Sequence, residues 1–300
     1  MSHHLLSRYP GEQIWLVDAS IYVFRAWFVR GNIPYDRRHK PINAVRGFLR
    51  FVYQLLHEQK PEQLAFAFDT SLQTSIRKDI YPAYKANREA APEELKYQFQ
   101  LCRDFLDALG IVQNASPHYE ADDLLGSWAD QQRAPDKQLI VISGDKDLAQ
   151  LVKDDDLWWD FGRRNPLHDG GIKSTFGVWP HQIADQLAIA GDKADNIPGV
   201  PGVGMATAAK LLKRFGDIDN LLTNIEMISN MQIRGAKRLQ TLITDHQDTI
   251  RLSRQLTQIH CAVPDIETTL HRRPINTKAL AELCDLLMLS EQQYQQWLSV

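Results

Sequence analysis

The chain has 300 residues, of which 44% are hydrophobic and 24% are charged. Such a chain can bury a sizeable core and is long enough for one large domain or two ordinary ones. Its 34 Lys and Arg residues against 37 Asp and Glu residues give a formal net charge of −3. This balance excludes a protein that coats nucleic acid by charge alone.

The cysteines and the start of the chain indicate a cytoplasmic protein. Cys102, Cys261 and Cys284 are far apart and form no C-x-x-C pair, so we expect neither a disulfide framework nor a thiolate zinc site. No apolar run approaches the roughly 18 residues of a membrane span. The first residues, MSHHLLSRYPGEQIWLVD, do not have the pattern of a secretory signal.

Three short apolar runs in the first half of the chain each lead to an aspartate. They are 14–17 before Asp18, 64–68 before Asp69, and 139–142, which leads through Ser143 and Gly144 to Asp145. Runs of four or five Val, Ile and Phe residues are typical of buried parallel strands. If these strands are neighbours, their aspartates converge at the carboxyl edge of the sheet.

Helical periodicity fills the rest of the chain. The predicted helical stretches are 45–56, 101–109, 124–128, 182–190, 205–215 and 279–287. Strands that alternate with helices predict an α/β domain with a mainly parallel sheet. A break at 176–180 separates this part from a glycine-punctuated helical region. We therefore expect an α/β domain over 1–175 and a helical domain over 176–300.

Further carboxylates lie where elements begin or end. They are Glu120, Asp122, Asp123, Asp147, Asp192 and Asp195. Helix capping and turn chemistry explain each cluster taken alone. Together with the three strand-end aspartates they make nine carboxylates, which repel one another unless cations neutralise them. Oxygen ligands favour Mg²⁺ or Mn²⁺, and two such ions about 4 Å apart suit phosphodiester hydrolysis.

A basic, aromatic segment follows Asp69. It contains Arg77, Lys78, Tyr84, Lys85 and Arg88. A charged run is usually a solvated loop or helix face. Beside a carboxylate–metal site, however, it can hold a phosphate backbone and stack an unpaired base.

A glycine-rich segment runs directly into the helix predicted at 205–215. Its candidate DNA-binding residues are Gly199, Val200, Gly202, Val203, Gly204, Thr207 and Lys210. Such a hairpin exposes backbone amides at a helix N-terminus, which bind phosphate without reading bases. The alternative is a tight helix–helix turn, and the hairpin alone supports both interpretations equally.

In combination, these motifs resemble the 5′-nuclease family, which includes the 5′→3′ exonuclease domain of bacterial DNA polymerase I and the flap endonucleases of phages and eukaryotes. The resemblance extends from Leu16 to about Val263. It rests on the blocks Phe68-Asp69, Tyr84-Lys85-x-x-Arg88, Glu120-Ala121-Asp122-Asp123, Gly144-Asp145-Lys146-Asp147-Leu148 and Gly191-Asp192-x-x-Asp195-Asn196-Ile197-Pro198-Gly199. The combination is highly specific, although no single block is.

The resemblance implies a PIN-like nuclease core with a helical C-terminal part. The nine acids match the family's ligands for two Mg²⁺ or Mn²⁺ ions. The segment of about 70–95 matches a helical arch, in which Tyr84, Lys85 and Arg88 are the candidate catalytic residues, with Lys85 and Arg88 acting on the scissile phosphate. The segment of about 186–215 matches a helix-3-turn-helix element that grips the duplex, with a K⁺ ion often held by carbonyls of its hairpin, here 199–204.

The expected protein is a stand-alone, Mg²⁺-dependent 5′→3′ exonuclease and 5′-flap endonuclease. It would be a monomer that acts on DNA with a 5′ end or flap, whatever the sequence, in primer removal and repair. One alternative is a PIN-like ribonuclease, against which the duplex-gripping hairpin argues. The other is a catalytically inactive DNA-binding module, against which the nine acids and Lys85 argue.

Overall fold

Five parallel strands of the described residues form the sheet at the centre of the molecule. The computed structural model describes residues 9–70 and 74–300, so that residues 1–8 of the chain start and 71–73 of the basic segment lie outside the described residues. The strands are β1 (Glu12–Asp18), β2 (Gln63–Asp69), β3 (Val112–Ser116), β4 (Lys137–Ile142) and β5 (Leu157–Trp159). Their order is β3-β2-β1-β4-β5. The expected α/β class is confirmed, and the three strands that lead to aspartates are neighbours.

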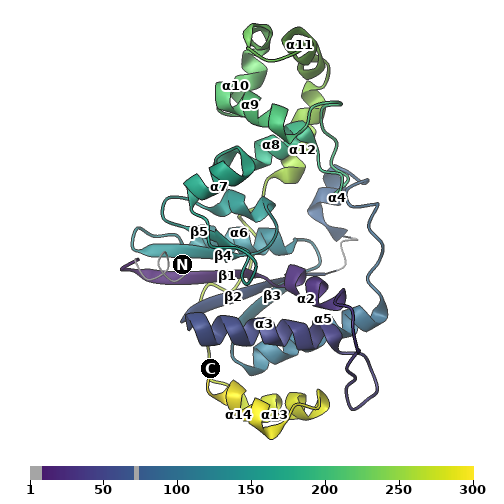
Figure 1. Cartoon of the computed structure of the whole chain (residues 1–300), viewed down its shortest axis with the longest axis vertical. Coiled ribbons are helices and arrows are strands. Elements are labelled where there is room, and N and C mark those ends of the chain that lie inside the picture. The colour runs from purple at the N-terminus through teal and green to yellow at the C-terminus, as the bar shows by residue number, and fades with distance from the viewer. Residues whose placement is uncertain (1–8, 71–73) are drawn as a thin grey trace.

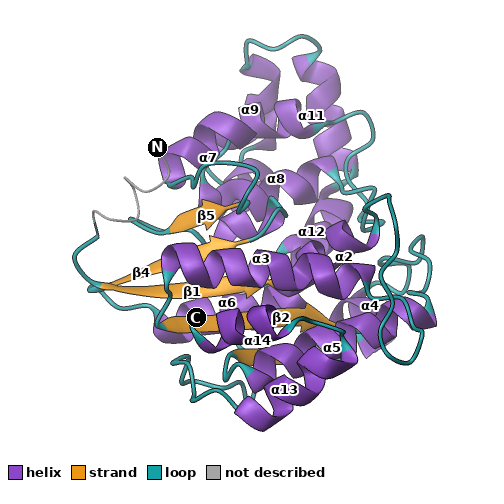
Figure 2. Cartoon of the chain, turned by 60° about the horizontal axis from the view of Figure 1, so that its bottom comes forward, coloured by secondary structure: helices purple, strands orange, loops and turns teal. Residues whose placement is uncertain are grey.

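Helices cover both faces of this sheet (Figure 1, Figure 2). The helices around the sheet are α2 (Ala19–Trp27), α3 (Asn43–Gln59), α5 (Glu93–Ala108) and α6 (Ala121–Gln132). In β1, Ile14 and Leu16 pack in the core that includes α6, whereas Trp15 and Val17 pack in the core with α2, α3 and α5. Successive side chains of a strand point to opposite faces. Burial on both faces explains why the strands are unbroken apolar runs in the sequence.

The helical part extends from one side of the core (Figure 1). It consists of α7 (Asp169–Phe176), α8 (Ile183–Ala190), α9 (Met205–Phe215), α10 (Ile218–Thr223), α11 (Ala236–Asp245) and α12 (Gln247–Thr257), with the short 3₁₀ turns η3 (Pro180–Gln182) and η4 (Ile225–Asn230). A further 3₁₀ turn, η2 (Asp147–Leu151), lies in the core between β4 and β5. The helix predicted at 205–215 is α9, and its bounds are the predicted ones. The helix predicted at 182–190 is α8, and its expected first residue lies in η3 instead.

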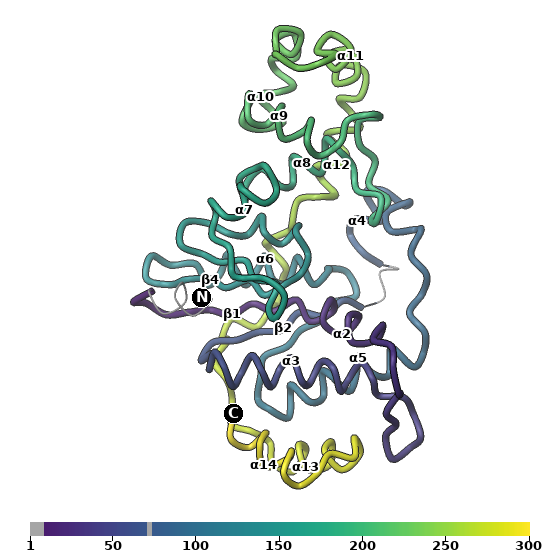
Figure 3. The backbone as a smooth tube through the Cα atoms, viewed as in Figure 1, coloured from purple at the N-terminus to yellow at the C-terminus, as the bar shows by residue number. Residues whose placement is uncertain are grey.

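The chain returns to the core after α12 (Figure 3). On the way, the Leu270 carbonyl accepts from the Leu64 amide at 2.8 Å, and the Glu267 carbonyl accepts from the Trp128 indole at 2.8 Å. The last two helices are α13 (Thr277–Leu286) and α14 (Glu291–Leu298). Leu280 and Trp297 place them in the core cluster of α3 and α5. No helix in the described part of the chain is both long and apolar enough to cross a membrane.

Candidate active site

The strand-end aspartates meet at one edge of the sheet, where parallel strands bring their carboxyl ends together. Asp18, at the end of β1, is 5% exposed and accepts a 2.7 Å hydrogen bond from the Ser143 hydroxyl, which follows β4. The same hydroxyl accepts from the Asp145 amide at 2.9 Å. Asp69, at the end of β2, accepts from the Ala121 amide at 2.9 Å. The fold therefore gathers these three predicted residues around the start of α6.

Burial and neighbouring carboxylates raise the pKa values of several acids in this group. Burial, and then Asp69, raises the pKa of Asp18 to about 7. Burial, and then Asp145, Asp18 and Asp69, raises the pKa of Asp122 well above its usual value. Burial and Asp145 raise the pKa of Asp147 to about 8. Mutual repulsion of this kind is relieved by a bound cation, and it is common at functional sites.

Glu120 opens α6 and faces the basic segment. Its Oε2 atom accepts from the Lys85 ammonium at 2.8 Å and from the Tyr84 hydroxyl at 3.1 Å. Burial alone would lower the pKa of Lys85, but Glu120, Tyr84 and Asp195 raise it well above its usual value. Lys85 is therefore a charged ammonium at the edge of the carboxylate group. Its φ of +51° is a conformation that non-glycine residues rarely adopt outside constrained sites.

The basic segment is less helical than the expected arch. Its described part contains one five-residue helix, α4 (Ile76–Ile80), before α5 begins. Tyr84 is 2% exposed and packs against Ile197 and Leu256, so its ring is not free to stack a base. Arg88 is exposed, and its guanidinium pairs with Asp195. Lys78 is half-buried.

Arg77 and Asp123 form a buried pair with each other. The guanidinium donates two 2.7 Å hydrogen bonds to the two carboxylate oxygens, and the side chains are 5% and 0% exposed. Asp123 also accepts from the amides of His260, at 2.9 Å, and Glu120, at 3.1 Å. The guanidinium donates to the Leu256 carbonyl at 2.9 Å as well. These contacts join the basic segment, α6 and the end of α12, and they leave no lone pair of Asp123 directed at the other acids.

The Gly191–Gly199 block folds as a non-helical turn. A helical turn would have put Asp192 and Asp195 on one face. A bridge between Asp192 and Ile197 closes it. The Lys146 ammonium lies 3.5 Å from an Asp192 oxygen, and the Lys85 ammonium lies 3.5 Å from an Asp195 oxygen. The turn thus presents its two carboxylates to two different lysines of the core.

The donor set fits hard divalent cations. It consists of carboxylates, and two of their buried oxygens, Oε1 of Glu120 and Oδ1 of Asp147, have no hydrogen-bond partner among the described residues. Such orphaned acceptors are costly unless a cation or water satisfies them. Within residues 9–70 and 74–300, no three His, Cys, Asp or Glu side chains are already gathered as a group that could hold a metal ion.

The glycine hairpin divides into a buried and an exposed half. Val200 and Val203 are 2% and 4% exposed, and their amides donate to the carbonyls of Ile189 and Val200. These two predicted DNA-binding residues are therefore part of the packing between α8 and α9. Their neighbours on the exposed side are Gly202, Gly204 and Lys210, with Thr207 half-buried. Gly204 is the N-cap of α9, and its carbonyl accepts from the amides of Thr207 and Ala208, at 2.9 and 3.0 Å.

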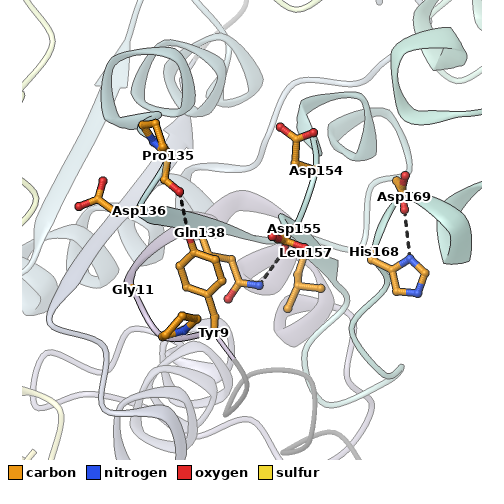
Figure 4. Close-up of a pocket in the computed structure, with 11 residues that line it drawn as sticks. Tyr9, Gly11, Pro135, Asp136, Gln138, Asp154, Asp155, Leu157, His168 and Asp169 are labelled. Atoms are coloured by element: carbon orange, nitrogen blue, oxygen red, sulfur yellow. Dashed lines mark hydrogen bonds and ion pairs between the residues drawn. The ribbon is translucent and has the colours of Figure 1, made fainter.

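A separate cavity of about 670 Å³ lies at the opposite edge of the sheet, where β1 and β4 begin (Figure 4). Tyr9, Gln138 and His168 line it together with aspartates. It contains none of the predicted site residues. It is therefore distinct from the carboxylate group.

Two residues that sequence analysis did not assign belong to the site. Ser143 joins Asp18 to the Asp145 loop, and Lys146 pairs with Asp192. In the sequence, Lys146 lies between the predicted metal ligands Asp145 and Asp147, and this position could have indicated that it belongs to the site.

The chain matches two family descriptions along most of its length. Residues 13–177 match the 5′–3′ exonuclease N-terminal resolvase-like domain. Residues 178–279 match the 5′–3′ exonuclease C-terminal SAM fold. The chain belongs to the 5′–3′ exonuclease family.

Relatives of known name agree with this membership. A 5′–3′ exonuclease of Buchnera aphidicola is 34% identical over 254 residues, which are 84% of this chain and 88% of that protein. DNA polymerase I of Rhizobium leguminosarum is 36% identical over 85% of this chain, which spans 25% of the polymerase. The flap endonuclease of bacteriophage T5, solved with DNA and metal ions, has the same fold, with a TM-score of 0.65 and 17% identity over 96% of this chain and 100% of that one.

Proposed function

We propose that this member of the 5′–3′ exonuclease family is a Mg²⁺-dependent 5′→3′ exodeoxyribonuclease and 5′-flap endonuclease. The observation that carries the proposal is the group of carboxylates from the ends of β1 and β2, the loop after β4, the start of α6 and the 191–197 turn. Three of them have pKa values raised by burial and then by neighbouring carboxylates, and Lys85 contacts two more. This combination suits metal-assisted phosphodiester hydrolysis.

The proposed metal ligands come from eight of the nine predicted acids. They are Asp18, Asp69, Glu120, Asp122, Asp145, Asp147, Asp192 and Asp195. Asp123 is left out because Arg77 occupies both of its oxygens. Two bound Mg²⁺ or Mn²⁺ ions would activate a water and stabilise the leaving oxygen. We propose that Arg77 acts as a structural partner of Asp123 rather than as a DNA contact.

The basic segment and the hairpin would hold the DNA. The ammonium of Lys85 and the guanidinium of Arg88 lie at Asp195, where they can exchange that carboxylate for a scissile phosphate. Tyr84 orients Glu120 through its hydroxyl. Lys78, the exposed hairpin residues Gly202, Gly204 and Lys210, and the half-buried Thr207 would contact the duplex backbone, without sequence preference. Gly199 would keep the hairpin close to α8, and a K⁺ ion at 199–204 is part of the proposal.

The cellular setting is proposed on the names of the relatives. DNA polymerase I and stand-alone exonucleases are both among them. We place this chain in primer removal and repair, as a cytoplasmic monomer with a core of about 1–175 and a helical part of 176–300. The proposed boundary at about residue 175 lies at the end of α7 (Asp169–Phe176), before α8 (Ile183–Ala190).

A cleavage assay on a 5′-flap DNA tests the proposal. The expected result is cleavage near the junction with Mg²⁺, none with EDTA, and a loss of at least about 100-fold for Asp145→Ala and Asp192→Ala, in line with removing a group that stabilises transition-state charge. Full activity in EDTA, or undiminished turnover of both variants, would refute the metal mechanism. An RNA hairpin serves as the comparison substrate, and its preferential cleavage would favour the ribonuclease alternative.

A further inference from the structure

Lys146 connects the core to the helical part of the molecule. It lies in the loop after β4, and its ammonium is 3.5 Å from Oδ2 of Asp192 and 3.8 Å from Oδ1 of Asp147. Asp147 belongs to the core, whereas Asp192 belongs to the turn that follows α8. One ammonium therefore neutralises two carboxylates that the proposed function assigns to metal ions.

Lys85 makes the equivalent connection on the other side of the turn. Its ammonium lies 2.8 Å from Glu120 of the core and 3.5 Å from Asp195 of the turn. Each carboxylate of the 191–197 turn is thus tied to a core carboxylate by a lysine. Lys85 is almost buried, with a side chain 9% exposed, whereas the Lys146 side chain is 42% exposed and can move at lower cost.

A second position for the Lys146 ammonium lies next to the one that it now occupies. Lys146 lines a cavity of about 330 Å³ together with Phe176, Gln186 and Met205. Gln186 is 1% exposed, and its amide nitrogen donates to the carbonyls of Phe176 and Met205, at 3.2 and 3.1 Å. In the part of the chain that the structure describes, its Oε1 atom has no hydrogen-bond partner. A buried acceptor without a hydrogen bond is unfavourable, and the Lys ammonium has three N–H groups that could donate to it.

We propose that Lys146 is a positioning residue that acts as an internal counter-cation. In the metal-free protein it holds Asp192 against Asp147 and so fastens the 191–197 turn to the core. Occupation of these carboxylates by a divalent ion requires the ammonium to withdraw, and it then donates to Oε1 of Gln186. This inference rests on the proposed metal site. It assigns to Lys146 a part in setting metal affinity and in keeping the turn in place before metal binds.

The first test measures Mn²⁺ binding to the metal-free chain by isothermal titration calorimetry, for the wild type and for Lys146→Met. Removing a unit charge about 4 Å from the ligands should tighten Mn²⁺ binding about three- to tenfold, the range expected for a partly exposed pair. Lys193→Met is the matched control, because Lys193 lies beside Asp192 but forms no ion pair in the described residues. It should change the Kd less than twofold. Equal effects of the two variants, or weaker binding by Lys146→Met, would overturn the proposal.

The second test follows hydrogen exchange of residues 191–197 in EDTA. Exchange should be faster in Lys146→Met than in the wild type, and Lys146→Arg should restore most of the protection. Unchanged exchange in Lys146→Met would overturn the fastening role. If the wild type binds no Mn²⁺ at all, the proposed metal site itself fails, whereas normal binding that is insensitive to Lys146 defeats this inference alone.

A double-mutant cycle tests the withdrawn position. Gln186→Leu removes the acceptor and should weaken Mn²⁺ binding in the wild-type background. The loss should disappear in the Lys146→Met background, because no ammonium then needs the acceptor. Equal losses in both backgrounds would show that Gln186 acts only through packing. They would refute the proposal that the withdrawn Lys146 ammonium donates to Gln186.

Discussion

Replacing Asp123 by alanine should destabilise the protein, whereas loss of a metal-binding acid should not. The Asp123 side chain is fully buried, and its oxygens accept from Arg77 twice and from the amides of His260 and Glu120. The variant would leave a guanidinium with a 5% exposed side chain without its counter-charge. Breaking a buried pair from one side costs about 3–5 kcal/mol. At about 2–4 °C per kcal/mol, Tm should fall by roughly 6–20 °C.

The measurement is thermal and urea unfolding in EDTA, with Asp145→Ala as the control. Asp145 is exposed and surrounded by like charges, so its removal should leave Tm unchanged or slightly raised while abolishing metal-dependent cleavage. A double change of Arg77 and Asp123 to Met and Leu should recover part of the lost stability, since apolar replacements of buried pairs are often tolerated. The reasoning is refuted if Asp123→Ala unfolds like the wild type and loses metal binding as Asp145→Ala does.

Three further predictions concern the pH dependence, the hairpin and the basic segment. Because the folded pKa of Asp18 is raised from 3.8 to about 7, the folded state binds its proton more tightly, so the unfolding free energy in EDTA should fall as pH rises from about 4 to 7, by up to about 4 kcal/mol. Asp18→Asn should flatten this slope, and an unchanged Tm profile would contradict the assignment. Gly199→Ala would place a Cβ 2.2 Å from the Gly191 nitrogen and should lower both Tm and duplex affinity. The Cβ of Gly204→Ala would meet no atom of the described residues within 4 Å, so this change should cost less than about 1 kcal/mol. Lys85→Ala should slow single-turnover flap cleavage far more than it weakens duplex binding in a gel-shift assay, and equal losses would show that its role is binding.

Local pattern was sufficient for the elements that depend on it. The apolar runs before Asp18, Asp69 and Asp145 predicted three strands, and the helix at 205–215 has the predicted bounds. These signals are visible because burial on two faces removes polar residues from a strand, and burial on one face of a helix repeats every three to four residues. The strands β3 and β5 were not predicted, because Val112–Ser116 contains polar residues and Leu157–Trp159 is only three residues long.

The sequence by itself determined the composition of the site: which acids are available, their place at element ends, and the lysine beside them. Only the tertiary structure decided which charge each one faces. Asp123 and Arg77 are 46 positions apart, and nothing local distinguishes Asp123 from Asp122; yet one is sealed against a guanidinium and the other lies among carboxylates. Likewise, Val200 and Val203 are small apolar residues that an exposed hairpin could also contain, but the packing of α8 against α9 buries them. Pairing and burial depend on contacts between distant segments, whose energies no local pattern encodes.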